Sequence, residues 1–232
     1  MVDGFINLAL DLDSLPHYVI RRGILESLRQ NLGVFRGTVV DIGCGRMPYR
    51  ELISASGCVT GYIGLDLDGA AYDVSVQADV RWDGVSLPLR DDSCDSALLT
   101  EVLEHCPAPT IVLSEAARVL RDGGTAFLTV PFLYPVHEAP NDFRRFTARG
   151  LEQAVLDSGF SSCRVFSYGG YHAAMAQMLG LWVSYTGFSR WRRKLLGRLA
   201  VPVVRYLVRK DRGCDPSQNR AIFPGLCAVA SV

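Results

Sequence analysis

The chain contains the stretch Thr38-Val39-Val40-Asp41-Ile42-Gly43-Cys44-Gly45-Arg46, and this stretch decides its fold class. Its apolar first half is rich in β-branched residues, which is typical of a buried parallel strand. The two glycines that follow let the backbone turn sharply and approach a ligand that side chains would keep away. We expect a helix to begin near Tyr49. A strand, a glycine-rich turn and a helix form the unit that builds a nucleotide site at the carboxyl edge of a doubly wound α/β sheet.

This turn does not suit a pyrophosphate. The third glycine of the dinucleotide pattern G-x-G-x-x-G would fall on Pro48, which makes a poor start for a phosphate-binding helix. The acid that precedes the glycines, Asp41, suits a cationic ligand better. The stretch resembles motif I of the class I S-adenosylmethionine (SAM) dependent methyltransferases, D-x-G-x-G-x-G, with Met47 in place of the third glycine. A plain strand-to-helix turn is the alternative.

Two acids further along the chain fit the same interpretation. The second expected strand, residues 61–65, ends in Asp66, which can accept hydrogen bonds from both ribose hydroxyls. The alternative is a turn aspartate that caps the next helix, a role we expect of Asp68. Residues 78–95 resemble the run "aDv…lPl.ddsfD" of the family related to ubiquinone and menaquinone biosynthesis enzymes. The resemblance implies that Asp79 and the backbone N–H of Val80 bind the adenine edge, which offers a matching donor and acceptor.

Two more hallmarks of that family follow in order. Residues 96–102 form the fourth expected strand and lead into EVLEH, so Thr100 and Glu101 should face the cleft. The helix over residues 110–120 should end at Gly123-Gly124 and carries "E..RVLrdGG", in which Glu115 and Arg118 are structural. The implied cofactor contacts are Asp41, Gly43, Cys44, Gly45, Asp66, Leu67, Asp79, Val80, Thr100 and Glu101. The implied cofactor is SAM, with S-adenosylhomocysteine as its product.

The resemblance covers residues 37–132 and implies a Rossmann-like, seven-stranded methyltransferase sheet of the α/β class. This sheet is mostly parallel, has an antiparallel last strand and carries helices on both faces. The 232 residues suit a single domain. We expect a helical lead-in over 1–36 that ends at Gly33, a SAM-binding core over 37–168, an apolar and basic cover or membrane-facing insertion over 169–220, and the last strand over 221–232.

The loop after the fifth strand, residues 131–147, is the expected acceptor site. It resembles the "P..yp.He.P.D..R.t" loop of methyltransferases often found with bacterial surface-glycan and sugar-modifying enzymes. Loops at the carboxyl edge of such a sheet carry function on a rigid scaffold. The alternative is a polar surface loop. The expected acceptor-binding residues are Tyr134, Glu138, Arg144 and Arg145, with either arginine available to an acidic or phosphorylated acceptor.

Methyl transfer to a hydroxyl is helped by a general base, and histidine has the most suitable pKa. We expect His137 to be this base, with His105 as the second choice, because they follow the fifth and fourth strands. Asp142 can orient the imidazole. A metal site through His137, Glu138 and Asp142 has a spacing that matches no recognised site, so no metal is expected.

The region after the sixth strand, residues 162–168, fits the core less well. No charged residue occurs from Val165 to Ser189, but glycines and polar residues interrupt this window too often for a membrane span. Residues 190–212 are basic and amphipathic and include Trp191, which suits an anionic membrane surface. A pair of cover helices with a solvated basic face, or a homodimer contact, is the alternative.

The composition limits the remaining choices. Lys+Arg and Asp+Glu are both 24, so no overall charge favours nucleic acid as a partner. The seven cysteines contain no C-x-x-C pair, which favours a reducing compartment and no zinc site. The N-terminus lacks the features of a signal peptide. We therefore expect a cytoplasmic protein, with peripheral contact at the inner face of the membrane as the alternative.

The resulting expectation is an O-methyltransferase that acts on a hydroxyl of a sugar, glycan or glycolipid precursor. Two alternatives stay open. The first is a methyltransferase of a small natural product or quinone-like lipid, which would need an apolar acceptor tunnel. The second is a non-catalytic SAM-binding protein in which the basic segment makes a membrane or partner contact.

Overall fold

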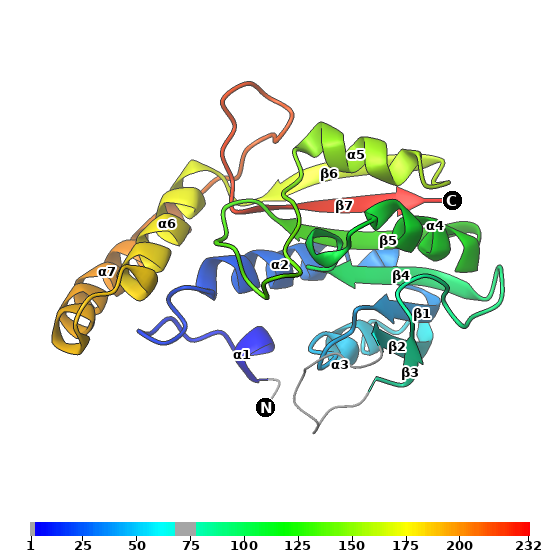
Figure 1. Cartoon of the computed structure of the whole chain (residues 1–232), viewed down its shortest axis with the longest axis horizontal. Coiled ribbons are helices and arrows are strands. Elements are labelled where there is room, and N and C mark those ends of the chain that lie inside the picture. Colours follow the sequence, from blue (N-terminus) through cyan, green and yellow to red (C-terminus); the bar gives the residue numbers. More distant parts are fainter. Residues whose placement is uncertain (1–2, 68–77) are drawn as a thin grey trace.

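The computed structural model describes residues 3–67 and 78–232 (Figure 1). Within these residues, seven strands form one sheet in the order β3-β2-β1-β4-β5-β7-β6. The strands are β1 (Gly37–Ile42), β2 (Val59–Leu67), β3 (Val80–Trp82), β4 (Cys94–Thr100), β5 (Leu120–Pro131), β6 (Ser162–Tyr168) and β7 (Gly225–Ser231). The first five run parallel, and β7 lies antiparallel between β5 and β6. The predicted sheet with its antiparallel last strand is confirmed.

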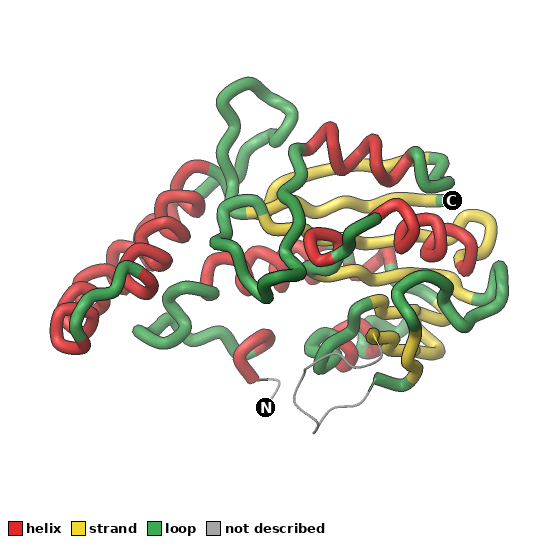
Figure 2. Tube along the Cα trace, in the orientation of Figure 1, coloured by secondary structure: helices red, strands yellow, loops and turns green. Residues whose placement is uncertain are grey.

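Alternate residues of the central strands enter two separate cores, as the period of two requires. Val40 packs on the face covered by α4 (Pro109–Val119) and α5 (Ala148–Leu156). Val39 packs on the opposite face, under α2 (Tyr18–Gln30) and α3 (Arg50–Ser54). Figure 2 shows the strands as one continuous layer with helices on either side. Helices therefore cover both faces of the sheet and exclude water from them, which explains the nearly unbroken apolar runs of the central strands.

The two predicted N-terminal helix features had different outcomes. The predicted helical lead-in contains α2, which begins at Tyr18, after the short α1 (Asp3–Ile6). The prediction that Gly33 ends this helix was wrong, because Asn31 ends it and its side-chain amide donates to the Ser27 carbonyl at 2.8 Å. Gly33 lies instead in the 3-10 turn η1 (Leu32–Val34).

Later helix ends follow the same rules of capping. Thr147 caps α5, and its hydroxyl accepts from the backbone N–H of Gly150 at 3.1 Å. The prediction that Gly123-Gly124 ends the preceding helix was wrong, because α4 gives way at once to β5 and the two glycines lie inside that strand. A register shift between β4 and β5 accommodates them. Glu115 and Arg118 are structural, as predicted, and form an ion pair of 2.6 Å. Asp68 lies outside the described residues.

The segment predicted to cover the core is a pair of helices, α6 (Tyr171–Tyr185) and α7 (Arg190–Lys210). The pair extends away from the sheet in Figure 1 (orange, left). The buried residues Leu15 and Val19 of the lead-in pack against Ala176 and Val204 of the pair. Among the described residues, no helix has both the length and the apolar character that a membrane crossing requires.

Candidate functional site

The predicted glycine turn follows β1, with both glycines at positive φ, 71° for Gly43 and 51° for Gly45. A Cβ on Gly43 would lie 2.6 Å from the Val102 side chain, so glycine is required there for packing. A Cβ on Gly45 would have no atom within 4 Å, which leaves open space beside the backbone. The turn therefore offers a surface that a ligand can approach closely.

The backbone amides of this turn are directed at β2 and away from the open space. The N–H groups of Gly43 and Cys44 donate to the Leu65 carbonyl at 2.8 and 2.9 Å. The N–H of Gly45 donates to Asp66 Oδ2 at 2.8 Å. A phosphate cradle needs free amides that point at the anion. The geometry thus agrees with the expectation that this turn does not bind a pyrophosphate.

Met47, which stands where the family pattern has its third glycine, adopts a glycine-like backbone with φ of 48°. Its side chain packs over Gly64 of β2, where an added Cβ would lie 2.5 Å from the Met47 sulfur. Arg50 reaches the same sulfur, with its Nη1 at 3.2 Å. Gly64 on the neighbouring strand therefore leaves the space that the Met47 side chain occupies.

Asp41 is 2% exposed and lies at the end of β1. The Tyr62 hydroxyl donates to Asp41 Oδ2 at 2.7 Å, whereas Oδ1 has no hydrogen-bond partner among the described residues. Burial raises the pKa of the Asp41 carboxyl to about 7. An orphaned carboxylate oxygen in a low-dielectric site favours a cationic or donor-bearing ligand.

Asp66 connects the turn to the end of β2. It is 4% exposed, and its two oxygens accept from the backbone N–H groups of Gly45 and Leu67, both at 2.8 Å. These bonds hold the carboxylate at the carboxyl edge of the sheet, where ligands bind in this class of fold. The expected ribose contact of Asp66 and Leu67 stays a prediction.

Asp79 and Val80 occupy the start of β3 and not its end. Asp79 Oδ2 accepts from the Gly64 N–H at 2.8 Å and pairs with Arg50 at 3.1 Å. The acid that follows the carboxyl end of β3 is Asp83, whose Oδ1 accepts from Val85 and Ser86 N–H at 2.8 and 2.9 Å. The sequence interpretation missed Asp83 because a three-residue strand is too short for its pattern to be recognised.

Thr100 ends β4, and Glu101 follows it with a strained positive φ of 54°. Glu101 Oε1 accepts from the Thr129 hydroxyl of β5 at 2.9 Å. Burial raises the pKa of Glu101 to about 7. Glu104, in the 3-10 turn η2 (Leu103–His105), is fully buried, and neither of its carboxylate oxygens has a hydrogen-bond partner in the described part of the chain. The sequence interpretation missed Glu104, because nothing in EVLEH shows which glutamate turns inward.

The two histidines predicted as base candidates lie together, with ring centroids 4.7 Å apart. His105 Nδ1 lies 2.7 Å from the Asn141 carbonyl oxygen, and His137 Nδ1 lies 3.2 Å from Asp142 Oδ2. The predicted orienting contact between Asp142 and the His137 imidazole is therefore present in the structure. Burial lowers the pKa of His137, so its imidazole is neutral at pH 7. Whether either histidine acts as a base stays a prediction.

The arginines of the acceptor loop are engaged by the loop itself. Arg145 forms a two-pronged ion pair with Asp142, at 2.5 and 2.9 Å, and also donates to the carbonyls of Tyr134 and Pro135. Arg144 donates to the Pro107 carbonyl at 2.8 Å. These bonds tie both guanidinium groups to the backbone and side chains around the loop. Their expected contact with an acidic acceptor stays a prediction.

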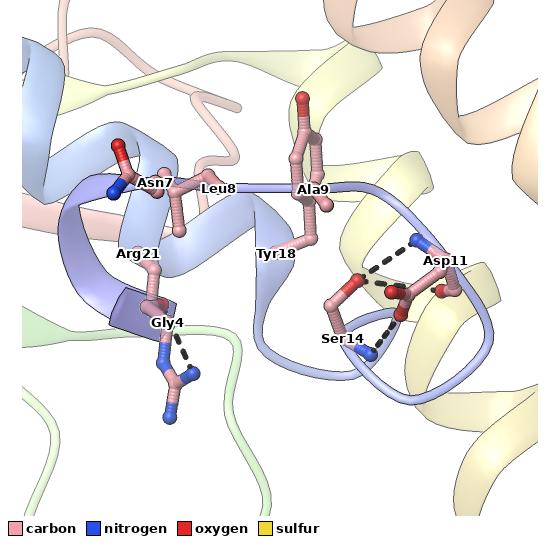
Figure 3. Close-up of a pocket in the computed structure, with 8 residues that line it drawn as sticks. All are labelled: Gly4, Asn7, Leu8, Ala9, Asp11, Ser14, Tyr18 and Arg21. Atoms are coloured by element: carbon pink, nitrogen blue, oxygen red, sulfur yellow. Dashed lines mark hydrogen bonds between the residues drawn. The ribbon is translucent and has the colours of Figure 1, made fainter. Parts of the chain in front are cut away.

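A third histidine joins this group from the lead-in. The His17 Nδ1 and Tyr134 hydroxyl lie 2.5 Å apart, and the Tyr134 and His137 ring centroids lie 5.0 Å apart. A separate open cavity of about 430 Å³ in the lead-in is lined by Gly4, Asn7, Leu8, Ala9, Asp11, Ser14, Tyr18 and Arg21. Figure 3 shows Tyr18 and Arg21 reaching into this region from α2. The sequence interpretation missed His17, since it lies 117 positions from its partner.

Residues 40–128 match the family model described as a methyltransferase domain. This range contains the glycine turn, Asp66 and the EVLEH segment, but not the acceptor loop. An uncharacterized methyltransferase of Mycobacterium ulcerans is 37% identical over 99 residues. That alignment covers 40% of this chain and 38% of the relative, so the chain spans less than two fifths of this relative.

Solved structures share the fold at low identity. A SAM dependent methyltransferase of Archaeoglobus fulgidus is 17% identical with a TM-score of 0.55, over 89% of this chain and 92% of that one. The phosphoethanolamine N-methyltransferase 2 of Haemonchus contortus, solved with S-adenosylhomocysteine, is 12% identical with a TM-score of 0.54, over 91% of this chain and 52% of that one. The predicted Rossmann-like methyltransferase fold is confirmed.

Proposed function

We propose that the protein is a SAM-dependent methyltransferase that methylates a hydroxyl of a polar acceptor, a sugar, glycan or glycolipid precursor. The observation that carries this proposal is the polar character of the acceptor side. Hydrogen bonds or ring contacts link four polar side chains in and beside the loop after β5. They are His17, Tyr134, His105 and His137. Such a lining can hydrogen-bond several hydroxyl groups. A quinone-like ring would call for an apolar tunnel instead.

The residues at the carboxyl edge fit a cationic adenosyl cofactor. We infer that the Gly43–Gly45 turn provides close approach, that Asp66 accepts from ribose hydroxyls, and that the carboxyl groups of Asp41 and Glu101 attract the positive sulfonium. The adenine edge has two candidate acids, Asp79 before β3 and Asp83 after it. When bound, SAM supplies a methyl group that is already activated on a sulfonium. The protein's own task is then to bind, orient and deprotonate the acceptor.

His137 is the proposed general base. Its Nδ1 lies 3.2 Å from Asp142 Oδ2, and this contact leaves Nε2 as the nitrogen that can take a proton. Asp142 is itself fixed by Arg145, so the imidazole is held in one orientation. A positioned base of this kind typically raises the reaction rate by about 10²–10⁴ fold. His105 is the second candidate, from the same cluster.

The test uses radiolabelled SAM with a panel of nucleotide sugars and one short-chain hydroxyquinone. We expect label to pass to a sugar, and His137→Gln to lower turnover at least a hundredfold while calorimetry shows unchanged SAM affinity. His172→Gln, on the exposed start of α6, is the matched control. Asp66→Ala should weaken SAM binding in the same calorimeter. Label on the quinone would overturn the acceptor class. Tight SAM binding without transfer to any acceptor would support the non-catalytic alternative.

We also propose that α7 lies against an anionic membrane surface. Five exposed apolar side chains form a stripe along α7, and each is between 46% and 63% exposed. They are Trp191, Leu195, Leu199, Val203 and Tyr206. Their spacing of three or four places them on one helix face. Arginine and lysine side chains accompany the stripe along the whole helix. A Trp-bearing apolar face with basic flanks binds anionic interfaces.

Sedimentation with vesicles of phosphatidylglycerol and phosphatidylcholine tests this contact. The double variant Leu195→Ser/Leu199→Ser should lose most of its sedimentation, whereas Val85→Ser, an equally exposed residue elsewhere, should not. Wild-type protein that stays in the supernatant but elutes as a dimer, with the double variant monomeric, would show the stripe to be a homodimer contact instead.

A further inference from the structure

Three side chains beside the acceptor loop have the arrangement of metal ligands. Glu104, His105 and His137 can each offer one ligand atom, and these atoms all lie within 4.8 Å of one another. Glu104 and His105 belong to the turn after β4, and His137 belongs to the loop after the neighbouring strand β5. The parallel pairing of β4 with β5 thus brings the three together at one edge of the sheet.

Glu104 independently indicates that a ligand belongs here. Its side chain is fully buried, and neither carboxylate oxygen has a hydrogen-bond partner among the residues that the structure describes. Buried carboxylates are normally paired, hydrogen-bonded or bound to a metal. His105 Nε2 lies 3.7 Å from Glu104 Oε1. This distance is too long for a hydrogen bond, and it leaves the carboxylate unsatisfied.

The opposite nitrogens of the two imidazoles are already occupied. His105 Nδ1 faces the Asn141 carbonyl at 2.7 Å, and His137 Nδ1 faces Asp142 and the Pro135 carbonyl at 3.2 and 3.3 Å. These oxygens accept a hydrogen bond from the N–H at Nδ1, so Nε2 carries the lone pair in both rings. Histidines that bind metals use this second contact to fix the tautomer and the ring orientation.

We propose that Glu104, His105 and His137 form a binding site for one divalent transition metal ion, of which Zn²⁺ fits best. Two imidazoles and one carboxylate are a common protein ligand set for zinc with an open fourth position. Donor atoms about 2.1 Å from a tetrahedral ion lie about 3.4 Å apart. The Glu104–His105 distance of 3.7 Å is already near that value, and the other pairs, which lie within 4.8 Å, need to close by at most about 1.4 Å. Mg²⁺ and Ca²⁺ prefer oxygen ligands and fit less well.

Glu138 occupies the solvent side of this site. Its Oε2 lies 4.0 Å from His105 Nε2, and its backbone has a strained φ of 52°. Residues held in such conformations gather at ligand sites. The cysteine spacing that argued against a zinc site in the sequence has no bearing on this histidine pair. An ion bound to His137 Nε2 would occupy the lone pair that the base role needs, so with the ion in place the metal, and not His137, would make the acceptor hydroxyl acidic; this role alone rests on the proposed function.

Direct metal binding tests the site without any acceptor. Chelator-treated protein is titrated with Zn²⁺ in a calorimeter and with Co²⁺ in a visible spectrometer, in a Cys58→Ser background because Cys58 is an exposed thiol. We expect one ion per chain and a Co²⁺ absorption spectrum of a nitrogen- and oxygen-ligated ion. Glu104→Gln and His137→Gln should each weaken binding at least tenfold, whereas His172→Gln should not change it. Thermal melts check that each variant is folded.

The outcomes separate this proposal from the proposed function. Absence of stoichiometric binding by the wild-type protein, or equal binding by Glu104→Gln and His137→Gln, would overturn the metal site. Ion binding that depends on these residues, together with failure of methyl transfer to every acceptor, would overturn the enzymatic role and leave the site intact. Methyl transfer that persists at full rate in excess chelator would remove the ion from the reaction.

Discussion

Replacing Asp41 by asparagine should stabilise the protein and abolish its cofactor binding. Burial raises the pKa of Asp41 to about 7 from an ordinary value of 3.8. At 1.36 kcal/mol for each pKa unit, keeping this carboxylate ionised at pH 8 costs the folded state roughly 4 kcal/mol. Asparagine keeps the shape of the side chain and can still accept from the Tyr62 hydroxyl. We therefore expect Asp41→Asn to raise the free energy of unfolding at pH 8 by about 2–4 kcal/mol.

The sign of the pH dependence follows from linkage. Between pH 4 and 7 the folded protein holds a proton on Asp41 that the unfolded chain releases, so the stability of the wild type falls as pH rises. The variant lacks this loss. Its advantage over the wild type should therefore grow by roughly 2–3 kcal/mol between pH 5 and pH 8. Asp91→Asn, a largely exposed carboxylate beside Arg118, is the control and should show no such growth.

Urea denaturation at several pH values measures the first effect, and calorimetry with SAM measures the second. Added SAM should stabilise the wild type according to its affinity and leave Asp41→Asn unchanged. A variant that is less stable than the wild type by more than 1 kcal/mol at pH 8 would refute the reasoning. So would an advantage that does not depend on pH, because it would have to come from packing and not from charge.

Three further predictions concern the turn, the adenine edge and the loop. Gly64→Ala should lower the free energy of unfolding by about 1 kcal/mol and weaken SAM binding, because the new methyl displaces the Met47 sulfur. In a Met47→Gly background, urea denaturation should show a smaller loss of stability. If Asp83 binds the adenine, Asp83→Ala should weaken SAM binding in calorimetry more than Asp79→Ala, and the reverse order would restore the original assignment. Asp142→Asn should lower the free energy of unfolding by about 1–3 kcal/mol at pH 7. The reason is that Arg145 holds the pKa of the Asp142 carboxyl well below the usual range. This cost should shrink as unfolding is followed below pH 4.

Local patterns were enough to predict the sheet. β6 begins and ends at the predicted residues, 162 and 168, and the strand that carries Asp41 lies directly before the glycine turn, as the sequence predicts. These elements are fixed by neighbours in the sequence: apolar periodicity, a glycine turn and a capping threonine. The errors at Gly33 and Gly123 have the same physical origin. A glycine permits a helix to end but does not require it, and Asn31 or a following strand can end it first.

The polar site was harder to predict, because its contacts join distant parts of the chain. The loop histidine and its aspartate are five positions apart, and their pairing could be expected from the sequence. The contact of His17 with Tyr134 spans 117 positions, and nothing local in the lead-in announces it. Burial is equally invisible, since EVLEH contains two glutamates with the same chemistry. Only the packing of the turn after β4 shows that Glu104 is fully enclosed.

Three acids at the carboxyl edge of the sheet, of which Asp41 and Glu104 are buried and Glu101 is partly exposed, underlie the chemistry proposed here. For Asp41, Glu101 and Glu104, burial raises the pKa, which destabilises the folded chain when they ionise. A sequence selected only for stability would replace them with amides or apolar residues. The surroundings of Asp41 and Glu104 differ. Asp41 adjoins a backbone that a ligand can approach, whereas Glu104 adjoins two imidazoles with available nitrogens. The same unfavourable burial therefore indicates an organic cation on one side and a metal ion on the other.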